Sequence, residues 1–122
     1  MARAAESILQ INLMNWLRFN YPDIEKDTWH MANERQCSVH QGRLLKRLGV
    51  KRGISDLFIA VPMSGYHGLF LELKEGNGKP SKEQKEFLSR MLARGYAAVC
   101  VTGLDAAKSV IESYLRGNNV SI

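Results

Sequence analysis

The chain has 122 residues, which is enough for one domain with a single hydrophobic core and too few for a catalytic domain and a separate regulatory domain. Apolar residues make up 45% of the chain and charged residues 24%, so the composition excludes a disordered chain, a collagen-like repeat and a coiled coil. Seventeen Lys and Arg residues against twelve Asp and Glu residues give a formal net charge of +5, which favours a polyanionic partner.

No linker rich in Pro, Gly or Ser divides the sequence, so a single domain is expected over residues 1–122. Apolar residues recur at helical spacing over residues 3–19, and Tyr21-Pro22 is expected to stop this first helix. Residues 28–33 are a short β-compatible run and are predicted to form the first strand. The apolar face expected of the first helix comprises Ile8, Leu9, Ile11, Leu13, Trp16, Leu17 and Phe19.

A short amphipathic helix is predicted over residues 38–48, with Ser38 as its N-cap and Gly49 at its end. Its apolar positions are available for burial, and they are Val39, Leu44, Leu45 and Leu48. The helix and the residues after it also hold five basic residues and no acid, namely Arg43, Lys46, Arg47, Lys51 and Arg52. Such a run presents a positive face to phosphates, although a solvated helix face explains it equally well.

The second part of the chain is predicted to contain a β-hairpin, a helix, a strand and a final helix. Residues 56–61 and 69–74 are apolar runs separated by turn-forming residues, which is typical of a hairpin. Ser81 is expected to begin a capped helix. Residues 96–101 are predicted to be a strand buried on both faces, and the last helix covers residues 104–115. The order α-β-α-β-β-α-β-α indicates an α/β fold, a small mixed sheet flanked by helices.

Neither a membrane span nor a secretory signal is expected. The longest uninterrupted apolar stretch covers seven residues, 57–63, whereas about 20 are needed to cross a bilayer. The N-terminus holds an early acid, Glu6, and no apolar segment of a signal peptide. Cys37 and Cys100 show no C-x-x-C spacing and are expected to be reduced and structural. The sequence therefore predicts a cytoplasmic protein.

Three charged residues, Asp56, Glu72 and Lys74, fall in predicted strands where a core strand has little use for charge. Because alternate residues of a strand share a face, Glu72 and Lys74 point together, while Leu71 and Leu73 point into the apolar layer. A hairpin centred near residues 65 and 66 pairs positions that sum to about 131, which sets Asp56 opposite residue 75. The three charged groups are therefore expected at one end of the hairpin.

Two carboxylates held close together on strands repel each other unless a cation lies between them, and oxygen ligands suit Mg²⁺ or Mn²⁺. Such a metal can lower the pKa of a water and stabilise charge on a phosphodiester. Lys74 could orient or help to deprotonate that water, or neutralise the transition state. The backbone carbonyl of Leu73 is a further candidate ligand. Alternatively, Glu72 and Lys74 lie on a solvated face of the hairpin and Asp56 only begins a strand.

The segment Gly53-Ile54-Ser55-Asp56, sixteen residues before Glu72-Leu73-Lys74, resembles the PD-(D/E)XK nuclease pattern, with Ser55 where the pattern has proline. In particular, the chain is similar to the small stand-alone, viral or bacterial form of the VRR-Nuc family, from the early helix to the final strand. The resemblance implies a restriction-endonuclease-like core. It also implies that Asp56 and Glu72 bind the divalent metal and that Lys74 is catalytic.

The resemblance further implies a supporting acid in the first helix, which Glu6 matches, and a glutamine after the E-x-K strand, which Gln84 matches. Glu6 would help to hold or position the metal, and Gln84 would position water or phosphate. Stand-alone members of this kind look like homodimers that cut branched DNA such as Holliday junctions, in a bacterial or phage-infected cell. A two-fold dimer would supply two active sites for two strands.

We therefore expect an endodeoxyribonuclease that uses Mg²⁺ or Mn²⁺, hydrolyses phosphodiester bonds and selects branched DNA by its structure. The basic segment 43–52, together with Lys79 and Lys82, is expected to bind the DNA phosphates. Asn33 and Glu34 are expected near the site or the DNA. The alternative is a non-catalytic nucleic-acid-binding or assembly module that retains the nuclease fold, although such a module gains nothing from two acids facing a phosphate.

Overall fold

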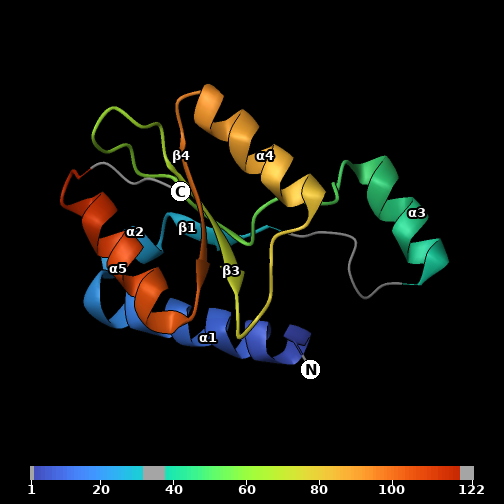
Figure 1. Cartoon of the computed structure of the whole chain (residues 1–122), viewed down its shortest axis with the longest axis horizontal. Coiled ribbons are helices and arrows are strands. Elements are labelled where there is room, and N and C mark those ends of the chain that lie inside the picture. Colours follow the sequence, from blue (N-terminus) through green and yellow to red (C-terminus); the bar gives the residue numbers. More distant parts are fainter. Residues whose placement is uncertain (1, 32–37, 119–122) are drawn as a thin grey trace.

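The structure, a computed structural model, describes residues 2–31 and 38–118 (Figure 1). Within these ranges a four-stranded mixed sheet is flanked by helices, which confirms the predicted fold class. The elements are α1 (Ala2–Asn20), α2 (Pro22–Glu25), β1 (Thr28–His30), α3 (Val39–Leu48), β2 (Leu57–Ile59), β3 (Leu69–Lys74), α4 (Lys82–Ala93), β4 (Ala97–Thr102) and α5 (Leu104–Leu115). Asn33, Glu34 and Cys37 lie outside the described residues. Among the described helices, none is long and apolar enough to span a membrane.

The short helix α2 is an element that the sequence patterns did not predict. Tyr21 ends α1 as expected, but Pro22 then occupies the first turn of α2. Proline has no backbone N–H to donate, and its fixed φ suits the first position of a helix, so the same residue can stop one helix and start the next. The observed order is therefore α-α-β-α-β-β-α-β-α.

The strands lie in the order β1-β2-β3-β4. β1 pairs with β2 and β2 pairs with β3 in antiparallel fashion, whereas β3 and β4 run parallel and are joined by the crossover helix α4. This arrangement places the E-x-K strand β3 in the middle of the sheet, between a hairpin partner and a parallel neighbour. Its side chains are therefore covered on both faces.

The hairpin register differs from the predicted one. Leu57 pairs with Leu71, so that paired numbers sum to 128, and the same register continued by one residue sets Asp56 opposite Glu72 rather than residue 75. Part of the reason lies at the tip, where Ser64 and Gly65 both have positive φ, as in a type I′ turn, and the bridge pairs residues 63 and 66, which lowers the sum to 129. Between this bridge and the strand pairing, the three residues 60–62 face only residues 67 and 68, and the extra residue lowers the sum to 128. The two carboxylates therefore come closer together than predicted.

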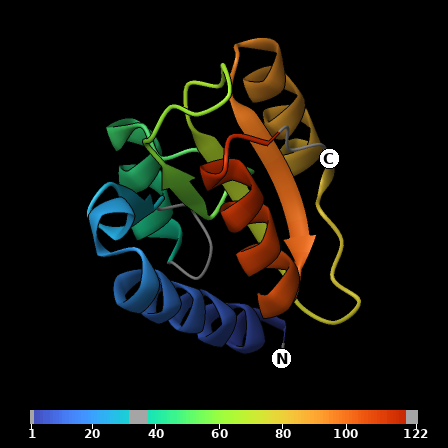
Figure 2. The same cartoon turned by 90° about the vertical axis from the view of Figure 1, so that its left-hand side faces the viewer.

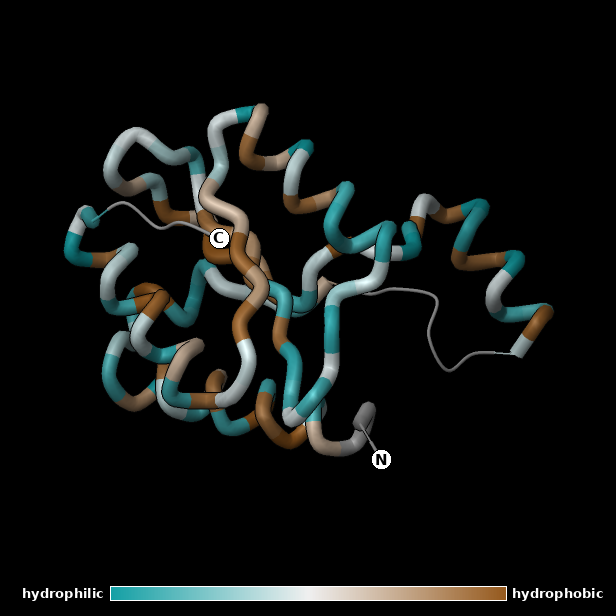
Figure 3. Tube along the Cα trace, viewed as in Figure 1, coloured by the Kyte–Doolittle hydropathy of each residue, from teal (hydrophilic) through white to brown (hydrophobic). Residues whose placement is uncertain are grey.

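The two faces of the sheet are covered by different helices (Figures 1 and 2). α1 and α5 cover one face, and the core on that side includes the strand residues Leu71 and Leu73, as the alternation predicted. α4 covers the other face, where Phe87 and Leu88 pack against Ala98 of β4. Figure 3 shows the apolar residues gathered along the central strands. Glu72 and Lys74 alternate with the core leucines, so they belong to the α4 face.

Part of the apolar surface expected to be buried is exposed. On α1, Leu9, Leu13 and Leu17 are buried, but the side chain of Phe19 is 87% exposed, and Ile8 and Ile11 also face outward. The buried residues recur every four positions and make a narrower stripe than the predicted face.

The local prediction for α3 is confirmed, whereas the prediction of its burial is wrong. Ser38 caps the helix, and Gly49 ends it in the left-handed conformation. No residue of α3 is buried against the described part of the chain, and Val39 and Leu48 are 76% and 70% exposed. α3 stands apart from the sheet and its covering helices (Figure 1). Caps and periodicity are local properties, whereas burial needs a partner surface, which the body of the domain does not supply.

Candidate active site

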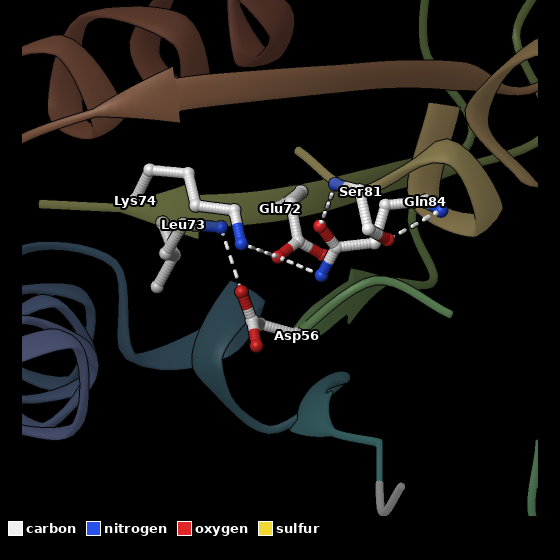
Figure 4. A network of polar contacts seen from close by, with 6 residues as sticks. All are labelled: Asp56, Glu72, Leu73, Lys74, Ser81 and Gln84. Atoms are coloured by element: carbon white, nitrogen blue, oxygen red, sulfur yellow. Dashed lines mark hydrogen bonds and ion pairs between the residues drawn. The ribbon is translucent and has the colours of Figure 1, made fainter. Parts of the chain in front are cut away.

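Three charged side chains lie together at one end of the hairpin (Figure 4). Asp56 directly precedes β2, and Glu72 and Lys74 end β3 on the face covered by α4. Asp56 is 6% exposed, Glu72 1% and Lys74 8%, so all three are buried. The alternative of a solvated hairpin face is therefore wrong. Burying three ionisable groups in a small domain costs stability, and such clusters are typical of functional sites.

Asp56 is held from two sides. Its Oδ2 accepts a hydrogen bond of 2.7 Å from the backbone N–H of Leu73, which lies between the two charged residues of β3. Its backbone carbonyl accepts from the N–H of Met31 at 3.0 Å, and Nδ1 of His30 lies 3.0 Å from the same oxygen. The neighbouring Ser55 is fully buried, and its hydroxyl has no hydrogen-bond partner in the described ranges.

The two oxygens of Glu72 have different surroundings. Oε2 accepts a hydrogen bond of 2.7 Å from Nε2 of Gln84 and lies 3.4 Å from Nζ of Lys74. Oε1 is buried and finds no donor among residues 2–31 and 38–118. The pKa of Glu72 is raised to about 8, mainly by burial and then by the negative charge of Asp56, while the ammonium group of Lys74 opposes the rise. The rise reflects the cost of ionising Glu72 beside Asp56, which would place two negative charges against one lysine.

Gln84 reaches Glu72 from the N-terminus of α4. Ser81 caps this helix, and its hydroxyl accepts from the backbone N–H of Gln84 at 3.1 Å, while its own N–H donates to Oε1 of Gln84 at 2.8 Å. The S-x-x-Q spacing of this capping box is visible in the sequence. The additional bond from Gln84 to Glu72 is not visible there, because it joins a helix to a neighbouring strand.

Glu6 lies close to the same cluster, near the end of β3. A Cβ built on Gly78 would lie 3.4 Å from Oε2 of Glu6 and 3.6 Å from Cδ of Lys74, so both side chains border Gly78. The negative charges of Glu72, Asp56 and Glu6, in addition to burial, raise the pKa of the Cys100 thiol, which pairs in register with Glu72. Glu6 does not complete a ligand group, since no three His, Cys, Asp or Glu side chains of the described residues are grouped to hold a metal.

The loop that carries Asp56 packs tightly against the start of α4 at Gly53. A Cβ on this residue would lie 2.5 Å from Cβ of Glu83, next to Gln84, and its φ is +82°. The glycine therefore permits both a left-handed backbone and a close approach of the Asp56 loop to the Gln84 helix. Sequence analysis singled out Gly53 only as part of the motif, because the clash involves a residue 30 positions away.

Gly53→Ala is expected to lower the free energy of unfolding by about 2–4 kcal/mol, because strain from the positive φ is joined by overpacking against α4. Gly49→Ala is the matched control. It also has a positive φ, of +99°, but nothing within 4 Å of its Cβ position, and it is expected to cost only about 1 kcal/mol. Urea unfolding followed by circular dichroism measures both variants. Equal losses in the two variants would contradict the tight contact at residue 53.

The basic residues are divided between two places. Lys51 and Arg52 precede Gly53, and Lys79 and Lys82 lie at the start of α4, so these four exposed side chains flank the end of the sheet where the acids lie. Arg43, Lys46 and Arg47 are exposed on α3, apart from the carboxylates. The two groups together present positive charge on both sides of the loop that leads to Asp56.

Comparisons with known proteins agree with this architecture. No protein-family model matches the sequence, and no curated protein is significantly similar to it. A solved structure described as a VRR_NUC domain protein is similar over 96% of this chain and 96% of its own, with 29% sequence identity and a TM-score of 0.82. The chain therefore has the restriction-endonuclease-like fold and is similar over nearly its whole length to a VRR-Nuc domain.

Proposed function

We propose that this domain is an endodeoxyribonuclease that depends on Mg²⁺ or Mn²⁺, hydrolyses phosphodiester bonds and prefers branched DNA such as Holliday junctions. The observation that carries the proposal is the buried cluster of Asp56, Glu72 and Lys74, with one carboxylate oxygen that has no donor in the described part of the chain. A purely structural role would leave that oxygen and the charge of the cluster without an explanation.

The donor set fits a hard divalent cation. Oε1 of Glu72 is buried and has no hydrogen-bond partner within the described residues, and burial and the nearby charge of Asp56 raise the pKa of Glu72. A cation at this place would give Oε1 a partner and reduce the repulsion between the two carboxylates. Asp56 and Glu72 would hold the ion, with the backbone carbonyl of Leu73 as a supporting ligand, while Glu6 lies nearby without completing the ligand group. Mg²⁺ commonly keeps several waters and binds through only one or two carboxylates, as this site would require. When bound, it supplies a Lewis acid that stabilises negative charge on a phosphate.

The protein side chains would then position the reacting groups. The N–H of Leu73 fixes the carboxylate of Asp56, and Lys74 and Gln84 fix that of Glu72. The ammonium group of Lys74 can donate a hydrogen bond to the attacking water or to a phosphate oxygen and neutralise charge in the transition state. The amide of Gln84 already bonds to Ser81 and Glu72, so we assign it to holding Glu72 rather than to water or phosphate.

The basic residues provide the DNA contacts in this proposal. Lys51, Arg52, Lys79 and Lys82 flank the acidic cluster and would bind phosphates next to the scissile bond. The exposed basic residues of α3 would contact phosphates farther along the duplex, namely Arg43, Lys46 and Arg47. Because such contacts release counterions, DNA affinity should fall steeply as salt is raised.

The proposed functional unit is a homodimer. Large apolar side chains are exposed on α1 and α3, among them Ile8, Ile11, Val39 and Leu48, and a second copy of the chain would cover such surface. Analytical ultracentrifugation at micromolar concentration is expected to give twice the chain mass of 13.8 kDa. A mass of one chain at that concentration would contradict the dimer.

Cleavage of labelled DNA tests the function directly. A four-way junction, a flap and a linear duplex are incubated with Mg²⁺, with Mn²⁺ or with EDTA. Cutting of the junction in both metals and none in EDTA is the expected result. Equal cutting of all three substrates would keep the chemistry and overturn the preference for branched DNA. Tight binding without cutting in either metal would favour the non-catalytic module.

A further inference from the structure

We propose that the capping box of α4 is a positioning device for the active site, in which Ser81 orients Gln84 so that Gln84 holds Glu72 with one oxygen open to a cation. The cation in this proposal rests on the proposed function. The orientation of Gln84 and Glu72 rests on the hydrogen bonds at the start of α4 alone. Ser81 is thereby given a role beyond starting a helix.

The amide of Gln84 is used at both ends (Figure 4). Its Oε1 accepts from the N–H of Ser81 at 2.8 Å, and its Nε2 donates to Oε2 of Glu72 at 2.7 Å. An amide oxygen can only accept and an amide nitrogen can only donate, so a flipped amide would lose both bonds. The capping bond therefore selects the orientation in which Gln84 donates to the carboxylate.

Two donors converge on one oxygen of Glu72 and leave the other without any. Gln84 and Lys74 both approach Oε2, and Oε1 remains buried without a donor from the described residues. A carboxylate free to rotate would exchange its two oxygens between these environments. The bond from Gln84 resists this rotation, so that the same oxygen stays open.

The molecule contains the same capping box a second time, at the start of α3. Ser38 accepts from the N–H of Gln41 at 3.0 Å and donates its own N–H to Oε1 of Gln41 at 3.1 Å. Gln41 is exposed, whereas Gln84 is 9% exposed and reaches a buried carboxylate. The capping box of α3 thus only stabilises the start of its helix, whereas that of α4 also orients a side chain that hydrogen-bonds to the site.

Calorimetric titration of Mn²⁺ into the metal-free protein tests the proposal without relying on cleavage. Gln84→Met keeps the length of the side chain and loses both amide bonds, and it is expected to weaken Mn²⁺ binding about 10-fold to 100-fold, as removal of groups that orient metal ligands does. Ser81→Ala is expected to weaken it about 3-fold to 10-fold, because the backbone N–H of residue 81 remains. Ser38→Ala and Gln41→Met, the matched controls, should leave the Mn²⁺ affinity within about 2-fold of wild type.

Thermal melting in EDTA identifies any variant that fails to fold. The side-chain NH₂ signals of Gln84 in an ¹⁵N spectrum report its hydrogen bond to Glu72 without metal. These signals should shift in Glu72→Ala, while those of Gln41 stay unchanged. Folded Gln84→Met with wild-type Mn²⁺ affinity, or Gln84 signals insensitive to Glu72→Ala, would overturn the proposal. If wild type itself binds no Mn²⁺, the proposed metal-dependent function fails. The ¹⁵N spectrum then tests the positioning of Glu72 separately: Gln84 signals that shift in Glu72→Ala support it, and signals that do not shift overturn it.

Discussion

Replacement of Lys74 by methionine is expected to lower the rate of phosphodiester cleavage about 1,000-fold, within the range of positioned catalytic groups and charge-stabilising donors. Lys74 is 8% exposed, and its Nζ lies 3.4 Å from Glu72, so its charge is used inside the site and not on the surface. Methionine preserves much of the buried stem, and the loss of the ammonium group is therefore the main change. Single-turnover cleavage of a labelled junction in Mg²⁺ measures the rate of the bond-breaking step.

Lys85→Met is the matched control for this prediction. Lys85 is exposed on α4 and is not part of the proposed site, so the variant removes the same charge without touching the cluster. Its cleavage rate should stay within about 2-fold of wild type, as for surface changes away from functional groups. A Lys74→Met protein that binds the junction and still cuts at more than about a tenth of the wild-type rate would contradict a catalytic role for Lys74.

Replacement of Glu72 by glutamine is expected to remove most of the pH dependence of stability in the metal-free protein. The pKa of Glu72 is about 8 in the folded chain against an ordinary value of 4.5, so the folded state holds a proton that the unfolded state releases between these values. Stability contributed by this proton is therefore present below pH 4.5 and lost as the pH rises toward 8. The free energy of unfolding in EDTA should fall by up to about 1.4 kcal/mol per pH unit in this window.

Glu72→Gln cannot ionise, and its amide oxygen can still accept the bond from Gln84. The free energy of unfolding of the variant should therefore change little with pH. At pH 8 it should be about 2–4 kcal/mol higher than that of wild type, and Mn²⁺ should no longer raise it. Urea unfolding at pH 5.5 and pH 8, with EDTA or Mn²⁺, measures these differences. Glu86→Gln, at an exposed position of α4, should behave as wild type. An unchanged pH dependence in Glu72→Gln would show that Glu72 is ionised in the folded protein throughout this range.

Much of the fold follows from short-range patterns. The caps at Ser38 and Ser81, the glycine end of α3 and the periodicity of α1 and α5 all act over a few residues, and each gives the expected element. The alternation of β3 likewise places Glu72 and Lys74 on one face and the leucines on the other, as the observed burial confirms.

The geometry of the site depends on contacts that no short pattern contains. The turn at Ser64 and Gly65, one residue earlier than expected, and the extra residue between this turn and β2 together set the register that brings Asp56 opposite Glu72. The register of a hairpin depends on which residues of its loop adopt positive φ. Several residues of this loop favour turns, so the sequence alone does not show which of them form the turn. The contact of Gly53 with Glu83 is equally invisible, because it joins segments far apart in the chain.

The spacing of Asp56, Glu72 and Lys74 on predicted strands already separates these charged residues from the core leucines and identifies them as the candidate site. Their contacts with one another and with α4 depend on the fold. Packing of α4 on the sheet turns the cap at Ser81 into a contact with Glu72, and the identical cap at Ser38 stays on an exposed helix. The physical reason is that hydrogen bonding within a turn is local, whereas burial and charge pairing depend on which surfaces the folded chain brings together.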